Sequence, residues 1–291
     1  MAISDNSQYQ VKKTNKGINV VIWIVLALWA FFNLFPLYWM FTFSLKDNNQ
    51  ILVTNKFGLP KGAPKEWIWQ NYKDAMEAGP IGKFFTNSII VTVIAIAITI
   101  IAAMMAAYAI TRIEWRYSGT MNRMFMLGIT IPIQASIIPV YIILSKLEWL
   151  DSYQALIIPY AAFSLAMALL ISIGFMTQIP KELDEAAYID GCGRGRVFFK
   201  VIAPLMKPAV ATISIYTFLQ CWNELMFAQT FNTREEIMTL PAGIQQLTGS
   251  YTVKWGPIGA ALTIATFPTI FVYILLSKRI QESFIAGAIK G

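Results

Sequence analysis

The 291-residue chain is 56% hydrophobic and 13% charged, with a formal net charge of +7 and a mean hydropathy of +0.55. This composition excludes an ordinary soluble domain, because the apolar residues fall in blocks long enough to cross a bilayer. The positive residues lie at the ends of these blocks rather than on one face, which argues for membrane orientation and against nucleic-acid binding. The sequence has no histidine and two separated cysteines, which excludes a disulfide framework and argues against a His/Cys metal site.

Residues 1–17 are polar and contain three lysines, and we expect them to form a disordered cytoplasmic tail. The remainder, 18–291, is expected to be a single transmembrane domain. Its first apolar block is too long for a signal-peptide core and has no small-residue cleavage site after it, so we interpret it as a retained span. The apolar blocks predict an all-α membrane protein with six transmembrane helices, at about 18–43, 84–110, 125–144, 153–176, 205–228 and 258–276.

The connections differ in length and polarity. Two long polar segments, 46–83 and 229–256, are expected on the outer face, the first with aromatic residues that we expect along the membrane surface. Pro132 and Pro139 interrupt the third span and break its backbone hydrogen-bond ladder. With six spans both termini lie on one side, which then carries most of the lysines and arginines, so both termini are expected in the cytoplasm.

The stretch 180–204 is the most polar part of the chain between two long apolar blocks. Pro180 and the acidic residues that follow it are typical of a helix start, and Gly191 is expected to end this helix in the left-handed conformation. A second, amphipathic helix is expected over 196–203, until Pro204 stops it. The stretch therefore predicts a helix–turn–helix on the cytoplasmic side.

This stretch resembles the EAA loop of the membrane subunits of ABC importers. Its form, E-A-A-x-x-x-G followed by an aliphatic residue and a proline, is matched by Glu185, Ala186, Ala187, Gly191, Ile202 and Pro204. Further stretches between 84 and 291 are similar to the second membrane subunit of maltose-type and glycerol-phosphate-type systems, in the carbohydrate-uptake class. They are Asp190 and Phe198 in the loop, Ile138 to Tyr141, Trp222 to Glu224, Thr239 to Pro241, Gly243, and Ala286 to Gly291.

The resemblance implies a type I ABC importer permease in a bacterial or archaeal cytoplasmic membrane, moving an oligosaccharide or related sugar by alternating access. It implies a second permease subunit, expected to be a sister chain, an extracytoplasmic solute-binding protein, and two ATPase subunits that bind ATP and Mg. This chain is then no enzyme and binds no cofactor or nucleic acid. ATPase coupling is expected at Glu185, Ala186, Ala187, Asp190 and Gly191, and a tail contact with the ATPase subunits at Gly287, Lys290 and Gly291. The family uses the region 229–256 as a loop that reaches into the binding protein.

Polar residues inside the apolar blocks are candidates for the solute path, because such groups are costly in lipid unless they face protein or water. The fifth span is expected to place Gln220, Asn223 and Glu224 on consecutive turns of one helix, with Trp222 beside them. Amides and carboxylates exchange hydrogen bonds with sugar hydroxyls, and an aromatic ring can stack on a sugar face. The alternative is that these groups join the fifth span to its neighbours, with Glu224 at the outer water boundary. Gln134 is a further candidate, unless it only satisfies backbone groups beside a proline.

Three alternatives compete with this interpretation, one within the same class and two from other classes. A permease for glycerol-phosphate-type or polyol compounds would share the same motifs. An ion-coupled secondary transporter should place several carboxylates near mid-membrane, whereas Glu224 alone approaches a span. A membrane enzyme would need a cluster of acid, base or metal ligands that this histidine-free chain does not offer. No Walker A sequence occurs, so the chain is not itself the nucleotide hydrolase.

Overall fold

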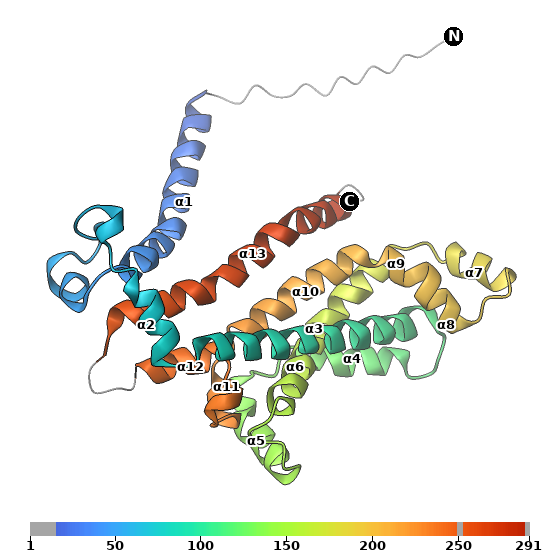
Figure 1. The fold of residues 1–291 in the computed structure, drawn as a ribbon. Helices are drawn as coiled ribbons and strands as arrows, with labels where there is room; N and C mark the ends of the chain where they lie inside the picture. The colour runs from blue at the N-terminus through green and yellow to red at the C-terminus, as the bar shows by residue number, and fades with distance from the viewer. Residues whose placement is uncertain (1–15, 249–252, 289–291) are drawn as a thin grey trace.

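The computed structural model describes residues 16–248 and 253–288, and all elements in these ranges are helical (Figure 1). The predicted tail, 1–17, lies outside the described residues except for its last two, which open the first helix. In chain order the elements are α1 (Lys16–Ser44), η1 (Gln50–Thr54), η2 (Pro64–Glu66), α2 (Gln70–Ala78), α3 (Ile81–Arg112), α4 (Ser118–Gly128), η3 (Gln134–Ser136), α5 (Ile137–Lys146), α6 (Gln154–Met176), α7 (Glu182–Ile189), α8 (Arg194–Val197), η4 (Phe198–Ile202), α9 (Ala203–Leu205), α10 (Lys207–Trp222), α11 (Met226–Phe231), η5 (Glu235–Ile237), α12 (Leu240–Leu247) and α13 (Trp255–Ala288).

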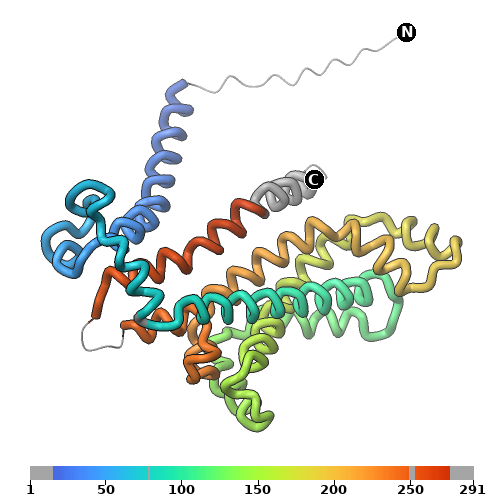
Figure 2. The backbone as a smooth tube through the Cα atoms, viewed as in Figure 1, coloured from blue at the N-terminus to red at the C-terminus, as the bar shows by residue number. Residues whose placement is uncertain are grey.

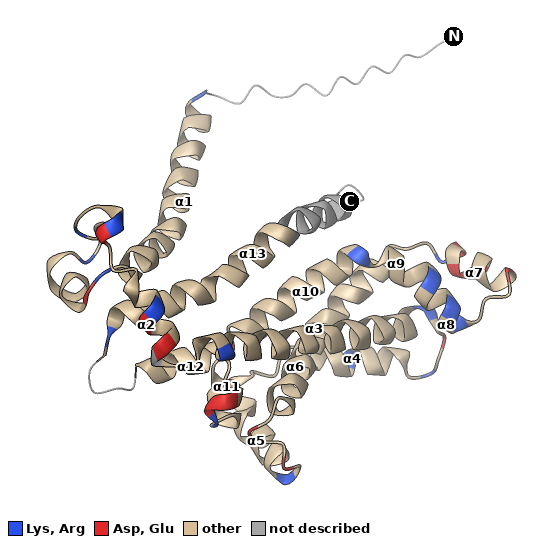
Figure 3. Ribbon diagram, viewed as in Figure 1, with Lys and Arg blue, Asp and Glu red and all other residues tan. Residues whose placement is uncertain are grey.

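Four helices of the described residues are long and apolar enough to cross a bilayer, and they match the first, second, fourth and sixth predicted spans. They are α1, α3, α6 and α13. Figure 3 shows why this assignment is physically reasonable: Lys, Arg, Asp and Glu gather around α7 and α8 at one end and around α2, α11 and α5 at the other, while the long middles of these helices carry none. Charges at both ends and apolar middles are the pattern of a membrane protein.

The third predicted span, 125–144, is two helices rather than one. Helix α4 ends at Gly128, and α5 begins only at Ile137. Pro132 lies in the non-helical stretch, where its missing N–H and its effect on the preceding residue prevent a helix from continuing. Pro139 does not break a helix, because it lies in the first turn of α5, where its N–H would have had no partner.

The fifth predicted span, 205–228, is also divided. Helix α10 ends at Trp222 and α11 begins at Met226, so the expectation that the candidate polar residues occupy consecutive turns of one helix is wrong. The amphipathic helix before it is also longer than predicted: Pro204 lies inside α9, and the chain turns by 74° only after Leu205, at the start of α10. Pro204 follows the π-helical turn η4, and the helix ends one residue after it.

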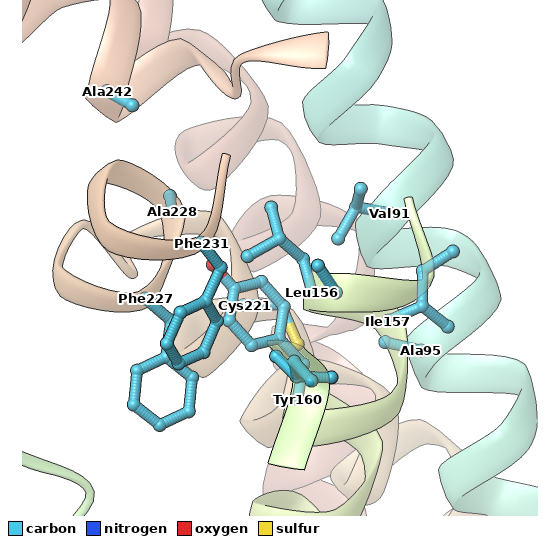
Figure 4. Close-up of a cluster of buried hydrophobic side chains, with 12 residues drawn as sticks. Val91, Ala95, Leu156, Ile157, Tyr160, Cys221, Phe227, Ala228, Phe231 and Ala242 are labelled. Atoms are coloured by element: carbon cyan, nitrogen blue, oxygen red, sulfur yellow. The ribbon is translucent and has the colours of Figure 1, made fainter. Parts of the chain in front are cut away.

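Helices α3, α6 and α10 form the centre of the molecule, and the contact between α3 and α6 is the most extensive (Figure 2). One buried cluster joins α3 and α6 to α11, with the rings of Phe227 and Phe231 4.7 Å apart beside Tyr160 (Figure 4). Helix α13 packs on α10 and also on α1. The apolar stretch of α1 buries no residue against the described chain, and its buried residues, Thr42 and Ser44, are at its end.

The segment 229–256 was expected to be a loop, but its described part is mostly packed structure. Helix α12 is buried against α3, and a Cβ atom at Gly243 would collide with the Phe84 ring. The Asn87 side-chain amide donates to the backbone oxygens of Glu236 and Met238, at 3.0 and 2.9 Å. The described part of this segment is therefore fixed over the start of α3.

Candidate functional site

The first helix of the EAA-like stretch is α7, and Gly191 ends it as the sequence predicts. Its φ of +77° is in the left-handed region, and its N–H donates to the backbone oxygen of Tyr188 at 3.0 Å. The next N–H, of Cys192, donates to the Ala187 oxygen at 2.9 Å. A Cβ atom at Gly191 would meet nothing within 4 Å, so glycine is required here for backbone conformation and not for space.

The two alanines of α7 lie on different faces. Ala187 is buried and packs in a cluster with residues of α3, α6, α8 and η4, including Tyr108 and Phe198. Ala186 is exposed, as are Glu185 and Asp190. Beside them Ile189 is 86% exposed. The outward face of α7 thus combines small, charged and apolar side chains, whereas Ala187 is small because it faces its own chain.

A buried ion pair attaches α7 to the end of α3. Arg112, the last residue of α3, places Nη1 3.0 Å from the Asp184 carboxylate, and its Nη2 donates to the backbone oxygens of Met176 and Ile179 at 2.8 and 2.6 Å. Burial raises the pKa of Asp184, and the guanidinium opposes that rise. In the sequence, Arg112 is one of the positive charges that indicate membrane orientation, and its partners here could not be predicted because they lie far along the chain.

A cavity of about 190 Å³ lies where the third and fifth spans are broken. Its walls come from the end of α4, the following non-helical stretch, α6, α10 and the gap after α10. The lining residues are Gly128, Ile129, Ile131, Ile133, Tyr160, Phe163, Ser164, Met167, Tyr216, Gln220, Cys221 and Glu224. The set includes three aromatic rings, three hydroxyl groups (two tyrosines and one serine), one amide and one carboxylate, and no lysine or arginine.

Glu224 is fixed at the edge of this cavity by three donors. Tyr160 donates its hydroxyl to Oε2 at 2.7 Å, and the N–H groups of Phe227 and Ala228 donate to the carboxylate at 2.9 and 3.2 Å. These N–H groups belong to the first turn of α11, which has no helical partner for them. Glu224 therefore holds the start of α11 and also presents a carboxylate to the cavity.

The family model described as "Binding-protein-dependent transport system inner membrane component" matches residues 95–285. The chain belongs to this family. The trehalose/maltose transport system permease protein MalG of Thermococcus litoralis is 33% identical, over 94% of this chain and 97% of the relative. The sulfoquinovosyl glycerol transport system permease protein SmoH of Agrobacterium fabrum is 34% identical, over 89% of each chain. A further relative, the diacetylchitobiose uptake system permease protein NgcG of Streptomyces coelicolor, is 30% identical over 91% of this chain.

The fold of the permease is that of a type I ABC importer subunit. A bacterial ABC transporter involved in the import of the acidic polysaccharide alginate superposes with a TM-score of 0.80 at 21% identity, covering 91% of this chain and 97% of the other. The permease is a multi-pass protein of the cytoplasmic membrane, and in this family separate ATPase subunits hydrolyse ATP. Within the described residues no three His, Cys, Asp or Glu side chains are grouped to hold a metal ion.

The structure separates the predicted path residues of the permease. Gln220 and Glu224 both line the cavity. Trp222 does not: its ring is buried against Phe218, and its indole N–H donates to the Ala265 oxygen of α13 at 3.0 Å. Asn223 is exposed and its amide donates to the backbone of α10, and Gln134 is exposed at the start of η3.

The tail residues fall at the edge of the described chain. Gly287 is in α13, whereas Lys290 and Gly291 lie outside the described residues. Sequence reasoning also missed the cavity residues of α6. Their spacing, Tyr160, Ser164 and Met167, is that of one helix face, and a hydroxyl-bearing stripe in an apolar block was the available signal.

Proposed function

We propose that the permease forms part of the membrane path of an ATP-driven importer for an oligosaccharide or related sugar, working by alternating access. The observation that carries this proposal is α7, which ends in a left-handed glycine and presents Glu185, Ala186 and Ile189 outward on a helix attached to the bundle by a buried ion pair. Relatives named for trehalose/maltose and diacetylchitobiose support a carbohydrate solute. The aromatic and hydroxyl-bearing lining of the cavity suits such a solute.

We assign α7 to the coupling contact with an ATPase subunit, through Glu185, Ala186, Asp190 and the turn at Gly191, while Ala187 supports it from inside. Two ATPase subunits binding ATP and Mg, a sister permease chain and an extracytoplasmic binding protein complete the importer. The cavity residues Gln220 and Glu224 are the proposed path groups. A glycerol-phosphate-type solute suits this cavity poorly, because its lining has a carboxylate and no cation. The tail at Gly287, Lys290 and Gly291 is proposed to contact the ATPase subunits.

Purification of the tagged permease from native membranes tests the function directly. We expect a soluble binding protein and a Walker-motif ATPase to co-purify, and the complex in proteoliposomes to hydrolyse ATP faster when the loaded binding protein is present. The ligand released from that binding protein on denaturation should be a sugar. ATP-independent uptake that collapses with the ion gradient would instead support a secondary transporter.

The proposed orientation places the EAA-like stretch and both termini in the cytoplasm, with 229–256 outside. In a variant whose Cys192 is replaced by alanine, Gly195→Cys is expected to react with an impermeant maleimide only after the inner face is opened. Glu235→Cys should react in cells with an intact inner membrane. Both positions are exposed, so access depends on the side of the membrane. The opposite labelling pattern would overturn the topology.

A further inference from the structure

Arg112 is a junction of three helices. It is the last residue of α3, its two Nη2 hydrogen bonds end on carbonyl groups at and just beyond the end of α6, and its Nη1 faces the carboxylate of Asp184 in the first turn of α7. The last carbonyls of a helix have no partners within it, so the guanidinium satisfies groups that α6 cannot satisfy itself. One planar group thus joins the ends of α3 and α6 to α7.

The pair is buried in a way that makes its loss costly. The side chains of Arg112 and Asp184 are 4% and 8% exposed. The other ion pair among the described residues, Lys73 with Glu77 on α2, is 68% and 65% exposed, and such surface pairs contribute little. Removing one partner of a buried pair leaves an uncompensated charge, and burial already raises the pKa of Asp184.

The other contacts between α7 and the bundle constrain the orientation of α7 less strongly. Ala187 packs in an apolar cluster, which resists separation but not sliding, and the hydroxyl groups of Tyr108 and Tyr188 are 3.2 Å apart, on α3 and α7. The Tyr188 ring is itself substantially exposed. The two hydrogen bonds from Arg112 Nη2 to the carbonyl groups of Met176 and Ile179 have fixed directions, because a guanidinium is planar and its donors form a rigid fork.

We propose that Arg112 is a positioning residue that transmits displacement of α7 to α3 and α6 as one unit. This inference rests on the proposed function, in which an ATPase subunit moves α7. Helices α3 and α6 have the most extensive contact in the molecule, and α6 carries Tyr160, whose hydroxyl binds Glu224 at the cavity. A shift at α7 is thereby carried along the α3 and α6 pair to the cavity.

Two substitutions separate the two halves of the junction. Arg112→Lys keeps a positive charge but replaces the fork with one ammonium group, which cannot reproduce the directed bonds to the α6 carbonyls together with the ion pair. Asp184→Asn keeps those carbonyl bonds and removes the charge that faces Arg112. Lys73→Met, which removes the exposed ion pair on α2, is the matched control.

The experiment uses the complete importer in proteoliposomes, with its native binding protein and the ligand purified with that protein. For each variant we measure ATPase-subunit retention, stimulated ATP hydrolysis, and ligand transported per ATP hydrolysed. Arg112→Lys and Asp184→Asn are expected to retain the ATPase subunits and to hydrolyse ATP, with the transport-to-hydrolysis ratio lowered by about tenfold, because the broken pair is buried. Lys73→Met should match the unmodified importer.

An unchanged ratio in both variants would overturn the inference. So would a loss of transport that only follows lower membrane abundance or lost ATPase subunits, because that is the result of a purely structural role. Failure of the proposed function is distinguishable, since the unmodified importer itself would then show no ATP-driven transport.

Discussion

Replacing Gly191 with valine is expected to abolish transport while the permease remains in the membrane at normal levels. The residue has a φ of +77°, and the left-handed conformation costs an L-residue about 1–2 kcal/mol, with a β-branched side chain at the unfavourable end. Steric crowding contributes nothing to this cost, because a Cβ atom there would meet nothing within 4 Å. The strain is relieved by reshaping the end of α7, which moves Asp190 and Ile189 on its outward face.

Gly193 provides the matched control. It lies two residues further on, its φ is −73°, and a Cβ atom there would also meet nothing within 4 Å. Gly193→Ala should therefore transport normally. Measurements of membrane abundance, ATPase co-purification and stimulated hydrolysis on the same samples separate loss of the contact from loss of folding. Full stimulated transport by Gly191→Val would mean that the end of α7 is not part of the coupling contact.

Large substitutions at the two alanines of α7 should have different effects. Ala186 is exposed, so arginine at this position should leave the fold intact and still abolish transport, by overpacking the ATPase contact or leaving a charge unpaired in it. Ala187 is buried in the cluster beneath α7, and a large residue there should lower stability as well.

Replacing Glu224 with alanine is expected to reduce both transport and stability. The substitution leaves the N–H groups of Phe227 and Ala228 and the hydroxyl of Tyr160 without their acceptor. Each buried polar group left unsatisfied costs about 1–3 kcal/mol, so the start of α11 should come apart from the cavity edge. Thermal unfolding of the purified complex and transport in proteoliposomes are the measurements.

Three further variants distinguish a structural role from a role in the path. Asn223→Ala removes an exposed amide that is hydrogen-bonded to its own helix, and it should change neither the unfolding temperature nor the transport rate. Gln220→Ala removes a cavity group whose amide donates to the hydroxyl of Tyr216, so transport should fall without a loss of stability. Glu224→Gln keeps an oxygen acceptor, so the complex with this variant should unfold at a higher temperature than the complex with Glu224→Ala. Normal transport by Gln220→Ala and Glu224→Gln would show that the cavity is not on the solute path.

Local rules predicted the parts of this structure that depend on neighbouring residues. The positions of α1, α3, α6 and α13 follow from apolar length, and the end of α7 follows from the conformational freedom of Gly191. The effect of each proline was harder to predict, because Pro132 lies between two helices, Pro139 lies in the first turn of α5, and Pro204 lies inside the helix that it was expected to stop. Where a helix begins decides between these outcomes, and packing decides where it begins.

Pairing between distant parts of the chain was not predictable from one sequence. Arg112 and Asp184 are each ordinary charges near the end of an apolar block, and only the fold brings them together. Trp222 has the character of a sugar-stacking residue, yet its ring lies between α10 and α13. The sequence left open whether Glu224 is a path residue or a structural residue; in the structure it lines the cavity and also accepts hydrogen bonds at the start of α11.

The exposed helix α1 has a consequence for biogenesis. Because its apolar stretch buries no residue against the described chain, it can partition into lipid before the later helices exist and needs no tertiary partner to remain there. Its contacts lie towards the end near Thr42 and Ser44, where α13 packs against it and where Tyr72 and Asn71 of α2 form hydrogen bonds with Ser44. A nascent chain can therefore be anchored in the membrane by α1 before the remaining helices assemble around it.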